Sequence, residues 1–382
     1  MSIGTGNNVY DKLGVKRIVN AASWSTVMGG SLMPPAVIEA MAQAAQSFVD
    51  VDDLNARAGE TIARLTGAEA GLVTAGSAAG MLLEAAACMA GTDPAKVNRL
   101  PDTKGMKNEI IIHRGHRVTY DRSFRGAGAI LVEIGNTHST HEWELEDAIT
   151  DNTAAVAYVF GPPPGGALPL PRVVEIAHSR DVPVVVDAAA MLPPPENLTR
   201  YLDMGADMVS FSGGKGILGP QSTGVLCGRS DLIQAAVANG APNQGVGRVA
   251  KVCKEEIAGL VTALEIFVDT DHDAKNVHWA NVSENLAAKI DDVPGLTGKY
   301  IQATPELDAF ESATARVFVF RDHDYSGPSE SEIEAHLKDG DPPIYVFSAD
   351  HSNGIALSPV CLVDGDDDII VQRFREIMSN AS

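Results

Sequence analysis

A lysine between glycines is the first candidate for chemistry in this sequence. Lys215 lies in the segment SFSGGKGILG, directly after an apolar run typical of a buried strand. Glycine on both sides allows the backbone to pass close to a flat ligand and lets the lysine reach it. A lysine in an apolar pocket has a lowered pKa, so its amine becomes a nucleophile toward aldehydes. A phosphate-binding loop of the GxxxxGK[ST] type is excluded because Gly216 follows Lys215. A surface lysine in a flexible turn is the alternative.

An aspartate ends another apolar run. Asp187 follows VPVVV at residues 182–186. A carboxylate at the carboxyl end of a buried parallel strand lies where such sheets bind ligands. A helix N-cap for the segment that follows is the competing interpretation.

A glycine- and serine-rich turn provides a candidate anion site. Gly76, Ser77 and Ala78 stand between a strand-like run at 70–74 and an Ala-rich helix pattern at 78–90. The N–H groups at the start of a helix and the positive end of its dipole attract anions. Taken alone, this segment could equally be a simple turn.

The three elements together match the requirements of pyridoxal 5′-phosphate. The turn at Gly76 would hold the phosphate, Asp187 would keep the pyridine nitrogen protonated, and Lys215 would form an imine with the aldehyde. The ring would then act as an electron sink while Lys215 moves protons at the substrate α-carbon. We therefore predict a pyridoxal phosphate enzyme.

An alternation of strand and helix patterns must position these residues. Near-continuous Val, Ile and Ala strands between helices indicate a mostly parallel sheet that is covered on both faces. The sequence predicts an α/β fold with seven strands in this sheet. The strand patterns lie at 70–74, 109–112, 129–134, 154–160, 183–187, 207–211 and 223–227, and the helix patterns at 34–48, 54–66, 78–90, 142–150, 170–180 and 197–204.

The alternation stops near residue 255, which predicts a second domain. One long helix pattern at 255–290 precedes strand patterns and a final helix pattern. We expect an N-terminal segment at 1–30 that contributes to the active site, a large cofactor-binding domain at 31–258 and a smaller α+β domain at 259–382. The later strand patterns lie at 315–321, 343–347 and 354–358, and the final helix pattern at 367–379.

Charge and composition narrow the class of partner. The net charge of −21 repels phosphate backbones and anionic lipid, which argues against nucleic-acid and membrane partners. The four cysteines lie far apart without metal-ligand spacing, so we expect reduced thiols and no metal. No apolar run is long enough to span a bilayer, and no secretory signal is visible at the start. These features predict a cytoplasmic enzyme.

The segments around Lys215 resemble a known family. GADMVSFSGGKGILGPQSTGVLCGR at 205–229 and RVAKVCKEEIAGLVTALE at 248–265 look like the selenocysteine-synthase-related (SelA-related) branch of the fold-type I pyridoxal phosphate enzymes. The segments at 29–41, 48–83 and 100–128 are similar to those of bacterial D-glucosaminate-type ammonia-lyases. The resemblance runs through nearly the whole chain. It implies the fold-type I transferase architecture and an active site at a subunit interface, hence a homodimer or a higher homo-oligomer.

The resemblance also implies roles for individual residues. Lys215 would carry the Schiff base, Asp187 would pair with the pyridine nitrogen, and His116 would stack on one ring face while Ala189 packs on the other. The remaining residues would bind phosphate or substrate. Gly76, Ser77, Ala78 and Ser212 would hold the phosphate, Gln221 would reach the phosphate in a neighbouring subunit, and Arg248, Lys251, Ser25 and Thr26 would contact the amino-acid substrate.

Some positions depart from the family pattern. The loop at 23–31 lacks the arginine of the selenium-transferring relatives, and no arginine follows Pro359. These absences argue against a phosphorylated sugar-acid substrate. Trp24 and Met28 in the same loop favour a less polar substrate pocket. The chain is also acidic and starts near the first family segment, unlike the tRNA-dependent relatives, which carry a further N-terminal domain.

The predicted reaction is removal of water and ammonia from a small β-hydroxy amino acid, or a sugar amino acid, to give a 2-oxo acid. An amino-acid racemase or epimerase is the enzymatic alternative, and it would need a second acid/base, with His116 or Tyr120 as candidates. Alternatives of another class are a tRNA-dependent selenium transferase-like protein and a non-catalytic pyridoxal phosphate-binding protein.

Overall fold

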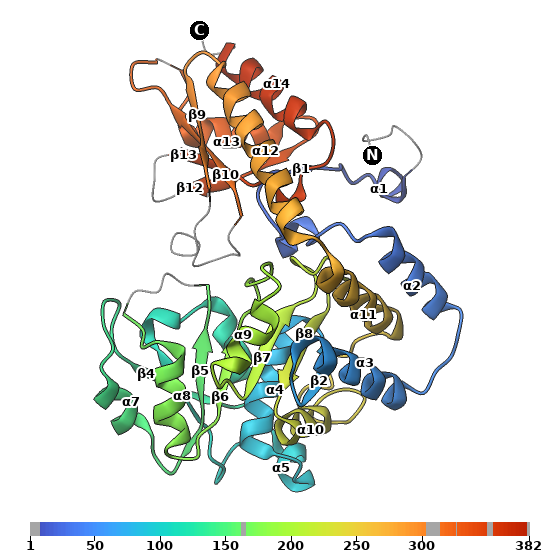
Figure 1. The fold of residues 1–382 in the computed structure, drawn as a ribbon, viewed down its shortest axis with the longest axis vertical. Coiled ribbons are helices and arrows are strands. Elements are labelled where there is room, and N and C mark those ends of the chain that lie inside the picture. Colours follow the sequence, from blue (N-terminus) through green and yellow to red (C-terminus); the bar gives the residue numbers. More distant parts are fainter. Residues whose placement is uncertain (1–7, 162–165, 303–313, 326, 350–353, 380–382) are drawn as a thin grey trace. The chain divides into compact units, whose positions relative to one another are not determined.

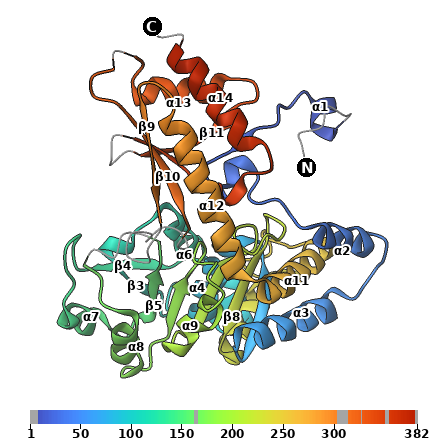
Figure 2. The same cartoon turned by 45° about the horizontal axis from the view of Figure 1, so that its top comes forward.

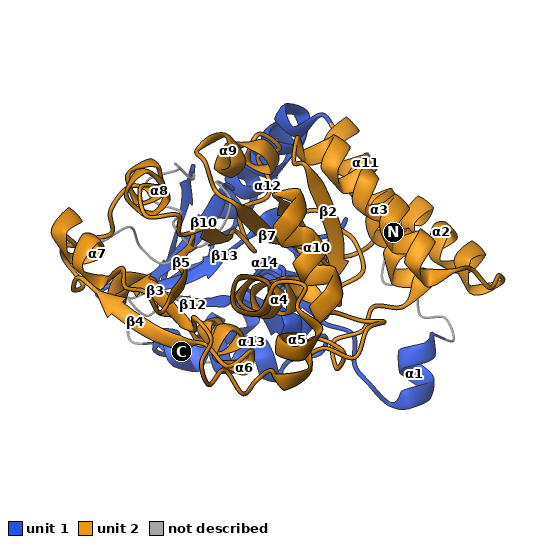
Figure 3. Cartoon of the chain, turned by 90° about the horizontal axis from the view of Figure 1, so that it is seen from below, with its two compact units in different colours: residues 1–30, 271–307, 313–382 blue, residues 31–270, 308–312 orange. Residues whose placement is uncertain are grey.

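The computed structural model describes residues 8–161, 166–302, 314–325, 327–349 and 354–379. The chain divides into two compact units, coloured separately in Figure 3. Unit 2 comprises residues 31–270, and unit 1 comprises the described residues of 1–30 together with those from Asp271 onward. Each unit is described by itself.

Unit 2 is built on the predicted seven-stranded sheet (Figure 1). The strand order is β2-β8-β7-β6-β5-β3-β4. β8 is antiparallel to both of its neighbours, and the other pairs are parallel. The prediction of a mostly parallel sheet is therefore confirmed. The strands are β2 (Ala70–Thr74), β3 (Glu109–His113), β4 (Ile130–Ile134), β5 (Thr153–Val159), β6 (Val184–Asp187), β7 (Met208–Ser212) and β8 (Gly224–Gly228).

Helices cover both faces of this sheet, and alternate strand residues point into two separate cores. Val185 and Met208 pack on the side of α4 (Gly76–Ala90), α6 (Arg122–Gly126) and α10 (Ser230–Asn239). Val186 and Val209 pack on the opposite side. That side is covered by α3 (Val51–Thr66), α7 (Glu142–Ala148), α8 (Leu170–His178), α9 (Asn197–Asp203) and α11 (Lys254–Asp269). Two further helices pack on other helices: α2 (Pro35–Ala45) packs on α11, and α5 (Pro94–Arg99) contacts α4.

α4 lies against the middle of the sheet because its residues are small. Its sequence is GSAAGMLLEAAACMA, and most of its side chains are buried. At Gly80 the helix approaches β7 so closely that an added Cβ would lie 3.0 Å from the Cβ of Ser210. This close packing fixes the start of α4 beside the carboxyl ends of β6 and β7.

Unit 1 combines an antiparallel sheet in the order β12-β13-β10-β9 with a short parallel pair, β1-β11. Its apolar core joins these strands to three helices. The strands are β1 (Val19–Asn20), β9 (Leu296–Ile301), β10 (Arg316–Arg321), β11 (Ile344–Tyr345), β12 (Phe347–Ala349) and β13 (Gly354–Leu357). The helices are α1 (Val9–Leu13), α12 (His272–Asp291), α13 (Glu330–Asp339) and α14 (Asp366–Ser379), and there are short 3₁₀ turns at η1 (Thr26–Met28) and η4 (Pro359–Cys361). Figure 2 shows most of these elements from a second direction.

The long helix predicted at 255–290 is wrong as a single element. α11 ends at Asp269, and α12 starts at His272 after Asp271, whose side chain caps the new helix by accepting a hydrogen bond from the N–H of Ala274. The expected domain boundary at 258 falls inside α11, whereas the units divide after Thr270. The reason is that α11 packs on α2 and α3 and so belongs to unit 2.

Within the described part of the chain, no helix is both long and apolar enough to cross a membrane.

Candidate active site

Asp187 lies at the carboxyl end of β6, with its side chain buried. Its Oδ1 accepts a hydrogen bond from the N–H of Ala189 at 3.0 Å. Burial raises the pKa of this carboxyl to about 6, while the N–H of Ala189 and the charge of Lys215 lower it. Asp187 and Lys215 are therefore close enough to interact electrostatically, as their proposed roles at one cofactor require.

Lys215 lies in the loop of residues 213–223, which joins β7 to β8. Gly213 donates its N–H to the carbonyl of Thr223 and accepts from the N–H of Gly219, both at 2.8 Å. The structure explains why glycines stand next to Lys215, which the sequence did not suggest. A Cβ added at Gly214 would lie 2.3 Å from the Cα of Gln221, and a Cβ added at Gly216 would lie 2.1 Å from the carbonyl oxygen of Leu192. The glycines let backbone pack on backbone, and this packing holds the half-buried Lys215 in place.

The predicted anion site is the start of α4. Gly76, with a φ of +73°, is the first residue of this helix, and Ala75 at the N-cap position provides no side-chain hydrogen bond. A Cβ on Gly224 would lie 2.7 Å from the nitrogen of Ser77, so β8 supports this turn closely. The uncapped N–H groups, the hydroxyl of Ser77 and the helix dipole form a site that suits a phosphate.

His116 is buried in the short turn η2 (Arg114–His116), which follows β3. Its Nδ1 accepts a hydrogen bond from the N–H of Val159 at 3.4 Å, and its ring lies 4.5 Å from that of Tyr158. Val159 pairs with Asp187 across neighbouring strands, so His116 lies near the end of β6. Burial, reinforced by the neighbouring His113, lowers the pKa of His116 to about 3, which keeps its imidazole neutral.

Ser212 ends β7, and Ala189 follows the end of β6. The N–H of Ser212 donates to the carbonyl of Ala189 at 3.3 Å, which brings these two residues together. Gln221 is exposed on the turn after Lys215. Ser25 and Thr26 belong to unit 1, where Thr26 starts η1.

Arg248 and Lys251 line one cavity of about 190 Å³ in unit 2. The same cavity is lined by Thr74, whose hydroxyl donates a hydrogen bond to the carbonyl of Gly76 at 2.9 Å. The structure therefore brings Arg248 and Lys251, two of the four predicted substrate-binding residues, to the strand that leads into the anion site.

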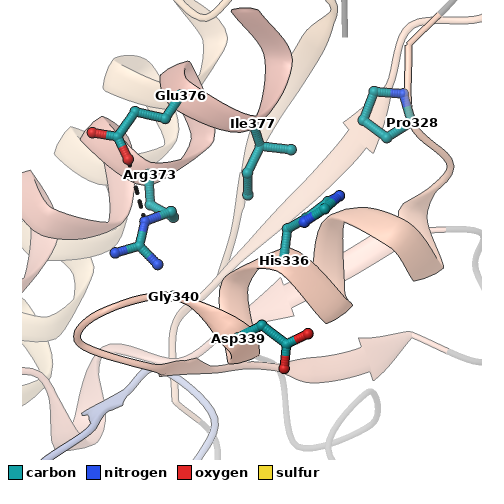
Figure 4. A pocket seen from close by; sticks show the side chains of 7 residues that line it. All are labelled: Pro328, His336, Asp339, Gly340, Arg373, Glu376 and Ile377. Atoms are coloured by element: carbon teal, nitrogen blue, oxygen red, sulfur yellow. Dashed lines mark ion pairs between the residues drawn. The ribbon is translucent and has the colours of Figure 1, made fainter. Parts of the chain in front are cut away.

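Unit 1 contains a different cavity of about 450 Å³, which none of the predicted residues line. Figure 4 shows it between α13 and α14, where Arg373 and Glu376 form an ion pair. Among the described residues, no group of three or more His, Cys, Asp or Glu side chains is arranged to hold a metal ion.

One buried acid near this site was missed from the sequence. Glu84 lies on α4 and is fully buried. Its pKa is raised well above the usual value, first by burial and then by the charge of Asp187. An isolated glutamate in an Ala-rich helix gives no signal of this proximity, because the contact depends on how the helix packs on the sheet.

The start of α4, Asp187 and Lys215 are the groups that pyridoxal phosphate would need, and the fold is that of the fold-type I pyridoxal phosphate-dependent enzymes. The model of the SelA family, described as L-seryl-tRNA selenium transferase, matches residues 19–292. The chain belongs to this family, and its cofactor is pyridoxal 5′-phosphate. The resemblance found in the sequence is thus confirmed.

Individual relatives are similar over almost the whole chain. D-glucosaminate-6-phosphate ammonia lyase of Salmonella typhimurium is 34% identical, across 98% of this chain and 99% of the relative. 5′-C-glycyluridine monooxygenase-decarboxylase of a Streptomyces species is 32% identical, across 98% of this chain and 93% of the relative. A solved structure of a D-glucosaminate-6-phosphate ammonia-lyase has a TM-score of 0.87 and 33% identity, covering 99% of this chain and 100% of that one.

Proposed function

We propose that this chain is an ammonia-lyase that eliminates water from a small β-hydroxy amino acid or a sugar amino acid to form an enamine, whose hydrolysis releases ammonia and a 2-oxo acid. The observation that carries the proposal is the interaction of the buried Asp187 with Lys215 beside the uncapped start of α4. The full-length similarity to an ammonia lyase supports this reaction class.

Each predicted residue would have a defined task toward the cofactor. The start of α4, from Gly76 to Ala78, would bind the phosphate together with Ser212, and Asp187 would hold the proton on the pyridine nitrogen. Lys215 would bind the aldehyde carbon, while His116 and Ala189 would pack on the two ring faces. When bound, pyridoxal phosphate supplies an electron sink that stabilises negative charge at the substrate α-carbon.

Lys215 would also be the base of the reaction. The freed Nζ of Lys215 would remove the substrate α-proton and would then donate a proton to the departing β-hydroxyl, which would leave as water. Arg248 and Lys251 would bind the substrate carboxylate, and Ser25 and Thr26 would contact the rest of the substrate. Hydrolysis of the released enamine yields the 2-oxo acid and ammonia.

The test is a product assay on purified protein that has been saturated with pyridoxal phosphate. We expect ammonia and 2-oxo acid in equal amounts from at least one β-hydroxy or sugar amino acid. The assay is run with and without dioxygen, because one relative is a monooxygenase-decarboxylase. Release of carbon dioxide that requires dioxygen, or α-proton exchange in deuterated water without ammonia, would contradict the proposal.

A racemase would need a second proton donor on the ring face opposite Lys215. The neutral His116 is poorly suited to this task, because its pKa of about 3 means that the acidic imidazolium form is absent at neutral pH. This observation argues against His116 as that donor and leaves Tyr120, which is exposed, as the other racemase candidate.

We also propose that the active enzyme is a homodimer or a higher homo-oligomer, in which Gln221 reaches the phosphate in a neighbouring subunit. Apolar side chains exposed on unit 2 support such an interface: Leu32, Ile38, Phe48, Val49 and Val51. Sedimentation should show a species larger than one chain, and mixing Lys215→Ala with Gln221→Ala should restore part of the lost activity. The cytoplasmic location stays a prediction from the sequence.

A further inference from the structure

Glu84 is a buried acid for which the proposed reaction has no use. It lies on α4, two turns after the anion site, and is 0% exposed. Neither of its carboxyl oxygens has a hydrogen-bond partner among the described residues. A buried carboxyl without a partner is costly, so its presence calls for a reason.

The packing of α4 directs Glu84 toward Asp187. Gly80, one turn earlier on the same face of the helix, packs directly against Ser210. Ser210 pairs with Asp187 in the parallel sheet, so both side chains point to the face that α4 covers. Ser210 is fully buried, and its Oγ also lacks a hydrogen-bond partner among the residues that the structure describes.

Burial and the neighbouring charges act differently on the pKa values of Glu84 and Asp187. Burial and then the charge of Asp187 raise the pKa of Glu84 well above its usual value, while the nearby Ser210 hydroxyl lowers it. Cys88 lies on the same side of the sheet as Glu84, whereas Cys227 packs in the core on the opposite side, and burial raises the pKa of both thiols. Lys215 acts on Asp187 in the opposite direction and favours its charged form.

We propose that Glu84 is a positioning residue for Asp187: it remains a neutral carboxylic acid and, through the hydroxyl of Ser210, holds Asp187 as the one ionised carboxylate of the pair. Two neighbouring carboxyl groups in a buried site do not both ionise, because the two negative charges repel each other. A hydroxyl can accept a hydrogen bond from Glu84 and donate one toward Asp187 at the same time. The proposal rests on the proposed function, since it assumes that Asp187 serves the pyridine nitrogen.

Three variants separate charge, polarity and packing. Glu84→Gln keeps the shape and a hydrogen-bond donor without an ionisable group, and Glu84→Leu removes both polar functions. Met81→Leu, at a fully buried position of the same helix, is the matched control for a change of packing.

The first measurement is the infrared difference between wild-type apoprotein and Glu84→Gln at pH 8. We expect a protonated-carboxyl stretch that belongs to Glu84, even though an exposed glutamate is fully ionised at this pH. Its absence would overturn the proposal. Because this measurement uses apoprotein, its result does not depend on whether the reaction is a lyase.

The second measurement is the affinity of each apoprotein for pyridoxal phosphate, followed by visible absorbance across pH. Glu84→Gln and Met81→Leu should bind as wild type does, and Glu84→Leu about tenfold more weakly, the loss expected for a buried hydrogen bond near a charge. Equal weakening by Gln and Leu would overturn the proposal. Failure of the wild-type apoprotein to bind pyridoxal phosphate would instead refute the proposed function.

Discussion

Asp187 makes the stability of the apoprotein depend on pH in a defined direction. Its pKa is about 6 in the folded chain and 3.8 in the reference state, so between these values the folded state binds more protons than the unfolded state. Stability therefore falls as pH rises from about 4 to 6. We expect Asp187→Asn apoprotein to be more stable than wild type by about 1–3 kcal/mol above pH 6 and equal to it below pH 4.

Denaturant unfolding of both apoproteins across this pH range measures the difference. A constant difference at every pH would contradict the assignment of the shift to Asp187. The holoenzyme provides the functional control, because Asp187→Asn should lower kcat by about 100-fold or more once the ring nitrogen loses its charged partner.

His116 provides a second prediction at this scale. If its ring packs on the cofactor, His116→Phe should bind pyridoxal phosphate nearly as well as wild type, and His116→Ala should bind about tenfold more weakly, since an aromatic contact is lost. Titration of each apoprotein by absorbance gives both values. Equal affinity of the alanine variant and wild type would exclude the stacking role.

At the scale of elements, the glycine next to the lysine controls the conformation of its loop. Gly216→Ala would place a Cβ 2.1 Å from the carbonyl oxygen of Leu192, which the backbone can relieve only by moving. We expect a loss of about 1–3 kcal/mol in stability and incomplete incorporation of cofactor.

Gly126→Ala is the matched control, because the nearest atom to its new Cβ, on Leu82, lies at 3.6 Å, an ordinary contact. Thermal unfolding and the ratio of visible to ultraviolet absorbance measure the two effects. Wild-type stability of Gly216→Ala would show that the loop does not require this close approach.

The sequence predicted the strands of unit 2 well because the signals there are local, whereas the helices α5, α6 and α10 were not predicted. Each buried strand of the sheet is a short apolar run, and Asp187 and Lys215 follow such runs directly. The break between α11 and α12 was less visible, although Asp271 is a typical N-cap residue. α13 was missed despite a capping box formed by Ser329 and Glu332.

Other features had no local signal. β1 and β11 pair two residues each across more than 300 positions of the chain, and only the tertiary fold brings them together. The proximity of Glu84 to Asp187 likewise depends on how α4 packs on β7 at Gly80. The roles predicted for the site residues follow from the resemblance, and they stay predictions until variants are measured.

At the scale of the whole molecule, the net charge of −21 predicts no affinity for nucleic acid. Family membership alone would suggest tRNA as a partner, so this prediction separates the chain from the activity in the family description. A gel shift with total tRNA at low salt should show no complex. A complex that weakens as salt is added would favour the selenium transferase-like alternative.

The central claim is that Lys215 anchors the cofactor covalently. Borohydride reduction of the holoenzyme, followed by digestion and peptide mass spectrometry, tests it directly. The account predicts that the reduced cofactor is attached to the peptide that contains Lys215, and that Lys215→Ala loses both this adduct and the visible absorbance band. Attachment at another lysine, or an unchanged band in Lys215→Ala, would contradict it.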